Sequence, residues 1–488
     1  MGDGMSDLKK NLAYNMLYQI LLFILPLVLS PYVSRVLGAQ GVGVYSYTYS
    51  IAGMAALFGM LGVNHYGNRS IAAVRDDREK RSREFWNIWF WQIVLTMAAM
   101  SGYACYLRFF CSPGLRRVSA IQILTVLNSM ADINWMFFGL EEFRLTVTRN
   151  VVIKGLAVLS VFAFVKEQKD LWIYVLIMAC SVLLGNLVLW TQVGKYMDFR
   201  RPEWTRAKKH IPKLAVLFVP VVAVSVYQRM DKVMLGSLSV MEQSGYYENV
   251  EKIINIPKGV ITALGTVMLP RMSYLISREE TGLIEQYTAR SMEFVMFSSS
   301  AMAFGIAAVA NDFAPFFFGS SFAGTGPLIQ LMSCTIIMVA CANVVRTQYL
   351  IPRCRDKVYL QSVWLGAAVN LLVNLCLIPS RGALGAVAGT VAAEGCVMLY
   401  QMYCVKRELD FFVYLRSGSC YMFCGLVMYA VVRAIAEGLR PHMGGARLIC
   451  CEILAGAAVY MVLAAPCAVY LHRAGFKEYW NAWKGKRK

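Results

Sequence analysis

The chain has 488 residues, of which 58% are hydrophobic and only 16% are charged. This composition excludes an ordinary soluble protein, in which about 25% of the residues are charged. The 48 Lys and Arg exceed the 29 Asp and Glu, for a formal net charge of +19. Such a charge is typical of proteins that bind nucleic acid or anionic membranes, and the position of the charges decides between the two.

Apolar runs of about 20 residues, the length that a helix needs to cross a bilayer, recur along the chain. They predict about fourteen transmembrane helices, at 14–34, 41–64, 85–107, 118–138, 150–165, 171–192, 214–236, 246–269, 291–311, 326–351, 358–379, 384–404, 417–436 and 448–471. The runs lack the alternation of barrel strands, and backbone that crosses lipid is otherwise helical. We therefore predict an all-α, polytopic membrane protein. No small-residue cleavage site follows the first run, so we expect a helix there and not a signal peptide.

Most basic residues lie in alternate loops of this predicted topology. They are found at Lys9 and Lys10, from Arg69 to Arg83, from Lys195 to Lys213, from Arg353 to Lys357, at Lys406 and Arg407, and from Arg473 to Lys488. Basic loops of polytopic proteins face the cytoplasm, so both termini are expected to be cytoplasmic. The basic tail is expected to rest on anionic lipid headgroups, and we predict no nucleic-acid partner.

The sequence lacks the signals of an enzyme or a metalloprotein. Nearly all of the 14 cysteines fall within predicted helices, where we expect packing residues, and the 4 histidines are scattered over loops. No Gly-x-x-x-x-Gly-Lys-Ser/Thr loop is present to hold a nucleoside triphosphate. The predicted loops are shorter than the ~50 residues of a small domain. We therefore predict no catalytic residues, no metal site and no cofactor.

The two halves of the chain carry a faint repeat. The stretch Arg35-Val36-Leu37-Gly38 corresponds to Lys232-Val233-Met234-Leu235-Gly236, with further glycine and arginine matches beyond each. Six spans precede the loop near residue 205, and six more precede the loop near 410. We predict two six-helix bundles, 1–205 and 206–410, related by a pseudo-twofold axis along the membrane normal around a central cavity. Residues 411–488 are predicted to add two transmembrane helices and the basic cytoplasmic tail.

A set of residues spread over most of the chain occurs in the order found in one family of membrane proteins. The set is Asn15, Pro26, Pro31-Tyr32, Arg35, Leu37-Gly38, Gly41, Gly43, Tyr45-Ser46, Gly62, Tyr66-Gly67-Asn68-Arg69, Asp231-Lys232, Leu235-Gly236, Gly245-Tyr246-Tyr247, Pro270-Arg271-Met272-Ser273, Asn370, Asn374, Pro379, Gly382, Gly385-Ala386 and Glu394. To about residue 405 the chain resembles the bacterial oligosaccharide flippases (polysaccharide biosynthesis and export proteins). Their superfamily also contains the multidrug (MATE) exporters and the peptidoglycan lipid flippase.

The resemblance implies translocation of an oligosaccharide linked to undecaprenyl pyrophosphate. The substrate would move from the cytoplasmic to the external leaflet of the bacterial cytoplasmic membrane by alternating access, for cell-surface polysaccharide. The implied partners are this lipid-linked substrate, membrane lipids and other polysaccharide assembly proteins. The energy would come from a proton or sodium gradient, or from consumption of the product.

Seven basic residues lie within the predicted spans, where exposure of a charge to the lipid centre costs about 3 kcal/mol. They are Lys154, Arg229, Lys232, Lys252, Lys258, Arg346 and Arg433. A cavity lined with cations is what a pyrophosphate needs while it crosses the membrane. By helical spacing, Arg229 shares a face with Lys232, and Glu251 shares one with Asn255 and Lys258. These five residues are candidates for the cavity wall.

Three further wall candidates have structural alternatives. Arg346, like Lys154 and Arg433, lies near a span end and can extend its charge to the membrane surface. Asp231 can neutralise a neighbouring cation as well as contact substrate. Arg35, at a helix end, can instead anchor a lipid headgroup.

Glu394, in the middle of a glycine-rich span, is a candidate for ion coupling because an ionised carboxylate is costly there. The small residues around it also fit tight helix packing with one hydrogen-bonded acid. Asn370 and Asn374, four residues apart, can bind sugar hydroxyls or join two helices by hydrogen bonds.

Other functions fit less well. A multidrug antiporter of the same fold should carry acidic residues for cationic substrates, whereas basic residues outnumber acidic ones in the predicted spans. A membrane-embedded polymerase or ligase of lipid-linked sugars needs catalytic residues on a sizeable external loop, and the predicted external loops are short. A scaffold for glycosyltransferases would not explain cations within the spans.

Overall fold

The computed structural model describes residues 2–203, 208–409 and 411–485. Side chains are described for these residues except 2–26, 215–217, 219, 220, 223, 226, 411–414, 416, 417 and 470–485. Asn15, Pro26 and the basic tail from Arg473 therefore lie outside the described side chains. Within the described part of the chain, every regular element is a helix.

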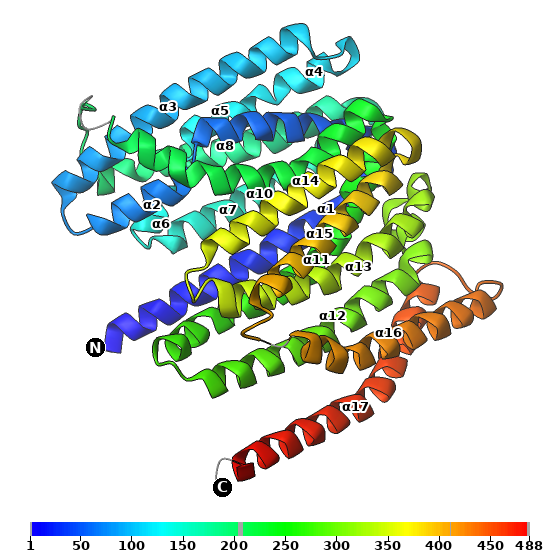
Figure 1. The fold of residues 1–488 in the computed structure, drawn as a ribbon. Coiled ribbons are helices and arrows are strands. Elements are labelled where there is room, and N and C mark those ends of the chain that lie inside the picture. Colours follow the sequence, from blue (N-terminus) through cyan, green and yellow to red (C-terminus); the bar gives the residue numbers. More distant parts are fainter. Residues whose placement is uncertain (1, 204–207, 410, 486–488) are drawn as a thin grey trace. The chain divides into compact units, whose positions relative to one another are not determined.

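Contacts divide the chain into two compact units, Met1–Glu248 and Asn249–Lys488. The first unit contains α1 (Gly2–Met60), α2 (Val63–Ala73), α3 (Arg78–Phe109), α4 (Pro113–Ile121), α5 (Ile123–Ala131), α6 (Asn134–Gly139), α7 (Phe143–Phe164), η1 (Gln168–Asp170), α8 (Leu171–Tyr196) and α10 (His210–Leu238) (Figure 1). Helix α11 (Met241–Ser277) begins in the first unit and continues in the second. The second unit also contains α12 (Thr281–Phe318), η2 (Ser320–Thr325), α13 (Gly326–Val345), η3 (Arg346–Leu350), α14 (Asp356–Arg381), α15 (Ala383–Val405), α16 (Phe411–Leu439) and α17 (Ala446–Gly485).

The predicted spans all fall on these helices. Eleven helical segments of the described residues are long and apolar enough to cross a membrane. Three predicted spans account for the difference from fourteen. Span 14–34 joins 41–64 in the single helix α1, and span 118–138 is divided among α4, α5 and α6. Span 214–236 lies on α10, which is not among the eleven segments. Large apolar side chains face outward along the helices, such as Leu372, Leu454 and Val462, which suits contact with lipid. The structure thus confirms an all-α, polytopic membrane protein.

Helix α1 changes direction at Gly38, between the first two predicted spans. Gly38 has φ 69° and ψ 179°, a conformation open to glycine and strained for residues with a Cβ. Farther along α1, a Cβ on Gly43 would lie 1.7 Å from the carbonyl oxygen of Met241, and a Cβ on Gly245 would lie 2.1 Å from that of Ala39. Small residues therefore let α1 and the start of α11 approach backbone to backbone within the first unit.

Aromatic side chains form much of the core of the first unit. Phe85 and Trp86 of α3 and Trp135 of α6 are buried together, and Trp89 and Trp190 pack against them. The rings of Trp89 and Trp190 lie 4.8 Å apart. This cluster joins α3, α6 and α8.

In the second unit, α12 packs against α13, α16 and α17, and α14 packs against α15. The expectation that the cysteines are packing residues is wrong for one pair, because Cys420 of α16 and Cys467 of α17 form a disulfide. The Sγ of Cys424 lies 3.8 Å from that of Cys467. The two helices are close enough for this link because they pack along each other through this region.

Candidate functional site

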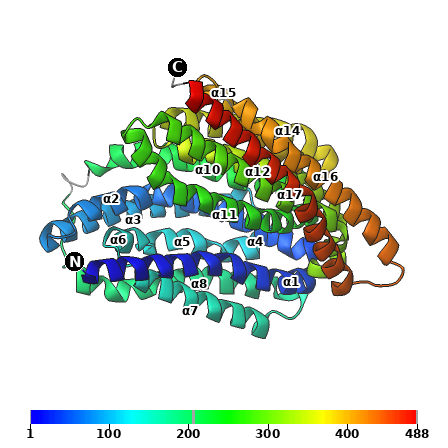
Figure 2. The same ribbon diagram turned by 90° about the horizontal axis from the view of Figure 1, so that it is seen from below.

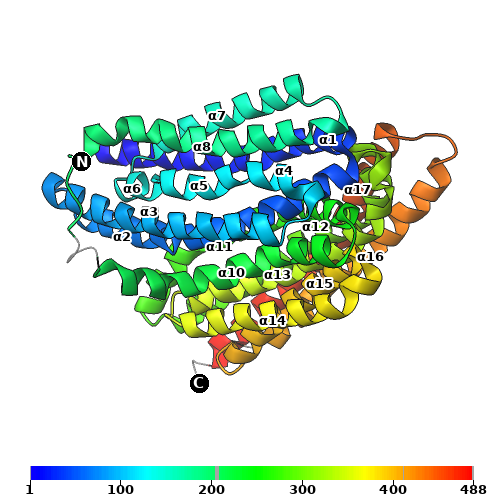
Figure 3. The same ribbon diagram turned by 90° about the horizontal axis from the view of Figure 1, so that it is seen from above.

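One predicted span of the first unit is broken into three helices. In both Figure 2 and Figure 3, α6, α5 and α4 follow one another in a line. At the second break, Asp132 leaves the helical conformation, and its Oδ1 accepts hydrogen bonds from the backbone N–H and Nδ2 of Asn134 at 3.1 and 2.7 Å. Irregular backbone at membrane depth occurs where it is enclosed by protein or lines a cavity. Discontinuous helices of this kind form substrate sites in transporters.

A cavity of about 310 Å³ lies at this break, within the first unit. Its wall is formed by α1, the start of α2, α5, α8 and α10. Its polar lining residues are Tyr45, Tyr49, Asn64, His65, Gln122, Thr125, Asn128, Ser129, Asp132 and Arg229. Amides, hydroxyls, aromatic rings, an imidazole and one guanidinium are suited to sugar hydroxyls and an anionic group, while the one carboxylate, of Asp132, accepts hydrogen bonds from Asn134.

The guanidinium of Arg229 reaches the cavity across the backbone of α1. A Cβ on Gly53 would lie 1.8 Å from Nη1 of Arg229 and 2.8 Å from Cζ. The absence of a side chain at Gly53 therefore leaves the space that the guanidinium occupies. Arg229 is half-buried and lines the cavity. Its five N–H donors can bind two oxygens of a phosphate at once.

A buried polar network of α7 and α8 side chains holds the broken span in place. Arg149 of α7 is 8% exposed, and it donates from Nη1 to Oδ1 of Asn186 at 2.7 Å and from Nη2 to Oδ1 of Asn134 at 2.8 Å. Asn186 in turn donates to Oδ1 of Asn128, at 2.8 Å. Asn128 and Asp132 both line the cavity. The network therefore fixes the positions of two cavity residues from α7 and α8.

The other two candidates on α10 take part in polar contacts with α11 within the first unit. Nζ of Lys232 lies 2.7 Å from Oε2 of Glu248, and the same oxygen accepts a hydrogen bond from the hydroxyl of Ser46 at 2.8 Å. Asp231 is buried and accepts a hydrogen bond from the hydroxyl of Tyr247. Through these contacts Lys232 and Asp231 both join α10 to the start of α11.

Arg35, the candidate on α1, is exposed three residues before the bend at Gly38. It is not among the residues that line the described cavity.

Two charged candidates of the second unit face each other. Nζ of Lys258, on α11, lies 3.6 Å from Oε1 of Glu394, on α15, and both side chains are about 15% exposed. The carboxylate of Glu394 therefore has a cation beside it. Of the two residues predicted to share a face with Lys258, Glu251 is half-buried and Asn255 is exposed.

The remaining candidates of the second unit make contacts within and between helices. Arg346 begins the π-helical turn η3, where its Nη2 donates to Oδ1 of Asn343 at 2.7 Å. Nδ2 of Asn374 donates to Oδ1 of Asn370 at 3.1 Å, and both residues are fully buried. A Cβ on Gly389 of α15 would lie 2.1 Å from Oδ1 of Asn374, so this pair is enclosed between α14 and α15.

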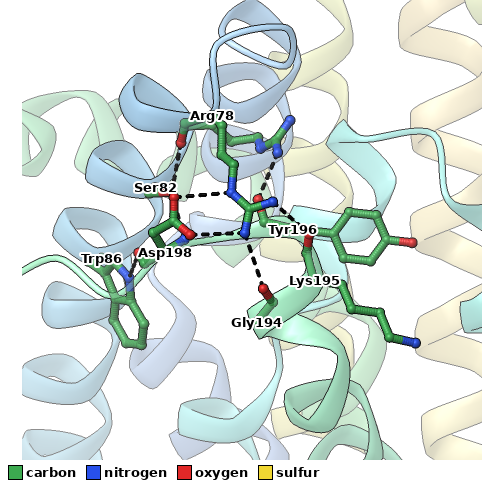
Figure 4. A network of polar contacts seen from close by, with 8 residues as sticks. Arg78, Ser82, Trp86, Gly194, Lys195, Tyr196 and Asp198 are labelled. Carbon is green, nitrogen blue, oxygen red and sulfur yellow. Dashed lines mark hydrogen bonds and ion pairs between the residues drawn. The ribbon is translucent and has the colours of Figure 1, made fainter.

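A second polar network holds the start of α3 against the end of α8 (Figure 4). The guanidinium of Arg78 binds both carboxylate oxygens of Asp198, at 2.9 and 3.0 Å, and donates to the backbone carbonyls of Gly194 and Lys195. Its charge therefore also meets the negative end of the α8 dipole. The hydrogen bonds from Arg78 lower the pKa of Asp198 below its usual value. Nε1 of Trp86 donates to the Asp198 carbonyl at 2.9 Å, which links this network to the aromatic core.

Long apolar helices, a broken span and a polar cavity beside it define a membrane transporter of the α-helical class. A model of the family described as "Polysaccharide biosynthesis protein" matches residues 8–276, more than half of the chain. The chain belongs to this family. A relative from Shigella dysenteriae named "Putative O-antigen transporter" is 20% identical over 402 residues, which cover 82% of this chain and 100% of the relative.

Solved structures show the same fold. The lipid II flippase MurJ in an inward closed conformation superposes with a TM-score of 0.70 at 13% identity, over 93% of this chain and 99% of MurJ. An inward-facing multidrug resistance transporter of the MATE family superposes with a TM-score of 0.60 at 12% identity, over 80% of this chain and 94% of that one. At these identities the likeness concerns the fold alone.

Proposed function

We propose that this protein flips an oligosaccharide linked to a polyprenyl pyrophosphate from the cytoplasmic to the external leaflet of the bacterial cytoplasmic membrane, for cell-surface polysaccharide. Both termini lie in the cytoplasm in this proposal. The observation that carries it is the placement of Arg229 in a polar cavity beside a broken transmembrane span. The family and the O-antigen transporter relative support the same substrate class.

In this function Arg229 binds the pyrophosphate, and the amides and hydroxyls of the cavity wall bind sugar hydroxyls. A cavity of about 310 Å³ holds part of an oligosaccharide at a time. The polyprenyl chain stays in the lipid, because burial of its hydrocarbon in a polar cavity would be unfavourable. The headgroup alone therefore needs a path through the protein.

The test uses purified protein in liposomes with a labelled lipid-linked oligosaccharide and a membrane-impermeant glycosidase. The native protein should speed the appearance of cleavable oligosaccharide over protein-free vesicles. Arg229→Ala should lower the rate about ten-fold or more, because a hydrogen bond to a charged group contributes roughly 1.5–3 kcal/mol. Arg229→Lys should retain part of the rate because the charge is kept.

Lys169→Ala is the matched control, since Lys169 is an exposed cation on η1 paired with Glu167 and lies outside the cavity lining. It should transport as the native protein does. Folded protein that transports no saccharide, but exports a cationic dye against a gradient, would replace this proposal with drug export. Equal rates for Arg229→Ala and Lys169→Ala would remove Arg229 from the substrate path.

A further inference from the structure

Helices α12, α16 and α17 pack together in the second unit (Figure 1). Five charged side chains of these helices lie close to one another. They are Asp312 on α12, Arg433, Glu437 and Arg440 on α16, and Glu452 on α17. The transport path proposed above uses none of them. Helices α16 and α17 also lie beyond the part of the chain that resembles the flippases, so this cluster needs its own explanation.

Asp312 and Glu437 form ion pairs with Arg433 and Arg440. Arg440 donates from Nε to Oδ1 of Asp312 at 3.0 Å and from Nη2 to Oδ2 at 2.6 Å. Arg433 lies between the two acids, with Nη1 3.8 Å from Oδ2 of Asp312 and Nη2 3.8 Å from Oε1 of Glu437. Arg433 is therefore part of an ion-pair network, and its predicted extension toward the membrane surface is not needed to account for its charge.

Glu452 is left without a hydrogen-bond donor. Its side chain is fully buried, and neither carboxyl oxygen has a hydrogen-bond partner. Its charged neighbours are Asp312, Arg440 and Arg433, and its carboxyl lies within hydrogen-bonding reach of Asp312. Two ionised carboxylates within hydrogen-bonding reach repel each other, whereas a protonated carboxyl can donate to a carboxylate. An ionised buried carboxylate without a donor would strongly destabilise the fold.

The buried part of the cluster is balanced in charge. Arg433 and Arg440 face the carboxylates of Asp312 and Glu452, whereas Glu437 is 68% exposed and in contact with solvent. The missing donor to Glu452, and not a net charge, therefore favours its protonation. A metal cation is a poor alternative, because Arg433 and Arg440 already occupy the space around Asp312 with positive charge.

We propose that Glu452 and Asp312 form a proton-binding site, in which the carboxyl of Glu452 keeps its proton at neutral pH and donates it to the carboxylate of Asp312. The site opens toward the surface at which α16 ends, where Glu437 is 68% and Arg440 is 37% exposed. Loss of the proton places a second negative charge against Asp312. Proton occupancy therefore controls how tightly α17 packs on α12, whatever substrate the protein carries.

The test is labelling of the full-length protein in detergent micelles with dicyclohexylcarbodiimide, which reacts with protonated carboxyls in apolar surroundings. Peptide mass spectrometry then identifies the labelled residue. At pH 7 Glu452 should be labelled and the exposed Glu437 should not, and labelling of Glu452 should fall as the pH is raised. Asp312→Asn should lower labelling of Glu452 about ten-fold at pH 7, because the repelling charge is gone and Arg440 becomes free to pair with Glu452.

Glu437→Gln is the matched control, because it removes an acid of the same cluster that does not face Glu452, and labelling should stay as in the native protein. Infrared spectra provide a second measurement should Asp312→Asn fail to fold: a carboxylic acid C=O band at neutral pH should be present in the native protein and absent from Glu452→Gln. Folded native protein without labelled Glu452 and without this band would overturn the proposal. So would unchanged labelling in folded Asp312→Asn.

Discussion

The guanidinium of Arg229 occupies the position that a side chain at Gly53 would fill, with Nη1 1.8 Å from the place of the missing Cβ. This relationship joins α10 to α1 at the wall of the cavity within the first unit. The atom that a new methyl group would meet is the far end of a flexible side chain, which can move aside at little cost in stability. A substitution of Gly53 should therefore move the guanidinium of Arg229 without destabilising the fold.

Gly53→Ala should displace the guanidinium by an ångström or more and lower the rate of oligosaccharide flipping several-fold, while the melting temperature stays equal or rises. The rise is expected because alanine is favoured over glycine by about 1 kcal/mol in a helix. The measurements are the liposome assay and thermal unfolding in detergent. Gly102→Ala is the control, since nothing lies within 4 Å of a Cβ on Gly102 of α3. If both variants transport alike, the position of Arg229 does not limit the rate.

Arg149→Met should destabilise the protein by about 3 kcal/mol, because Asn134 and Asn186 each lose a charged donor in a buried site. Arg144→Met, five residues earlier on the same helix, removes an exposed cation and should change stability little. Chemical denaturation in detergent measures both. A loss of stability in Arg144→Met as large as that in Arg149→Met would contradict the role of this network.

The apolar runs predicted the helices because a membrane leaves the backbone one way to pair its polar groups. They did not reveal the break at Asp132, since residues 118–138 remain apolar on average while the backbone leaves the helical conformation at Asp132. The available signal was the placement of Asn128, Asp132 and Asn134 within one apolar run. Arg149 was missed because the predicted span began at residue 150, whereas α7 begins at Phe143 and buries this arginine.

Charges within spans were easier to find than their partners. Helical spacing placed Lys258 with Glu251 and Asn255 on its own helix, but its cation lies beside Glu394 of α15, more than 130 residues away in sequence. Glu452 was passed over because the family resemblance ended near residue 405. Contacts between distant helices decide these sites, and a single sequence carries no direct record of such contacts.

The ion pair of Lys258 and Glu394 predicts non-additive effects on stability. Lys258→Met and Glu394→Gln should each destabilise the protein, because the remaining partner loses its counter-charge at a site about 15% exposed. The double variant should be more stable than the sum of the two losses predicts, by about 1 kcal/mol. Thermal or chemical unfolding of the four proteins measures this difference. Purely additive losses would show that the two charges act separately.

The same pair bears on ion coupling, for which Glu394 is our proposed residue. If Glu394 couples transport to a proton or sodium gradient, flipping by Glu394→Gln should no longer respond to an imposed gradient. A Glu394→Gln protein that flips faster with the gradient, as the native protein does, would assign Glu394 to helix packing alone.

His210 predicts a dependence of stability on pH below neutrality. Burial lowers the pKa of His210. Its Nδ1 lies 2.7 Å from the hydroxyl of Tyr66, which donates to an unprotonated nitrogen or accepts from a protonated one. Glu84, with Oε2 3.8 Å from Nε2, opposes the effect of burial. The folded state thus binds a proton less readily than the unfolded chain. The stabilising effect is complete above the unfolded pKa of about 6.5 and is lost as the pH falls from there through the lower pKa of the folded state.

Thermal unfolding at pH 8.0 and 5.5 in the same detergent measures this loss. The melting temperature of the native protein should fall between the two pH values by more than that of His210→Gln, because glutamine keeps a hydrogen-bond acceptor for Tyr66 and does not titrate. His65→Gln provides the control, as His65 is exposed on α2. Equal pH dependence in the native protein and His210→Gln would mean that folding leaves the pKa of His210 unchanged, with the attraction of Glu84 cancelling the effect of burial.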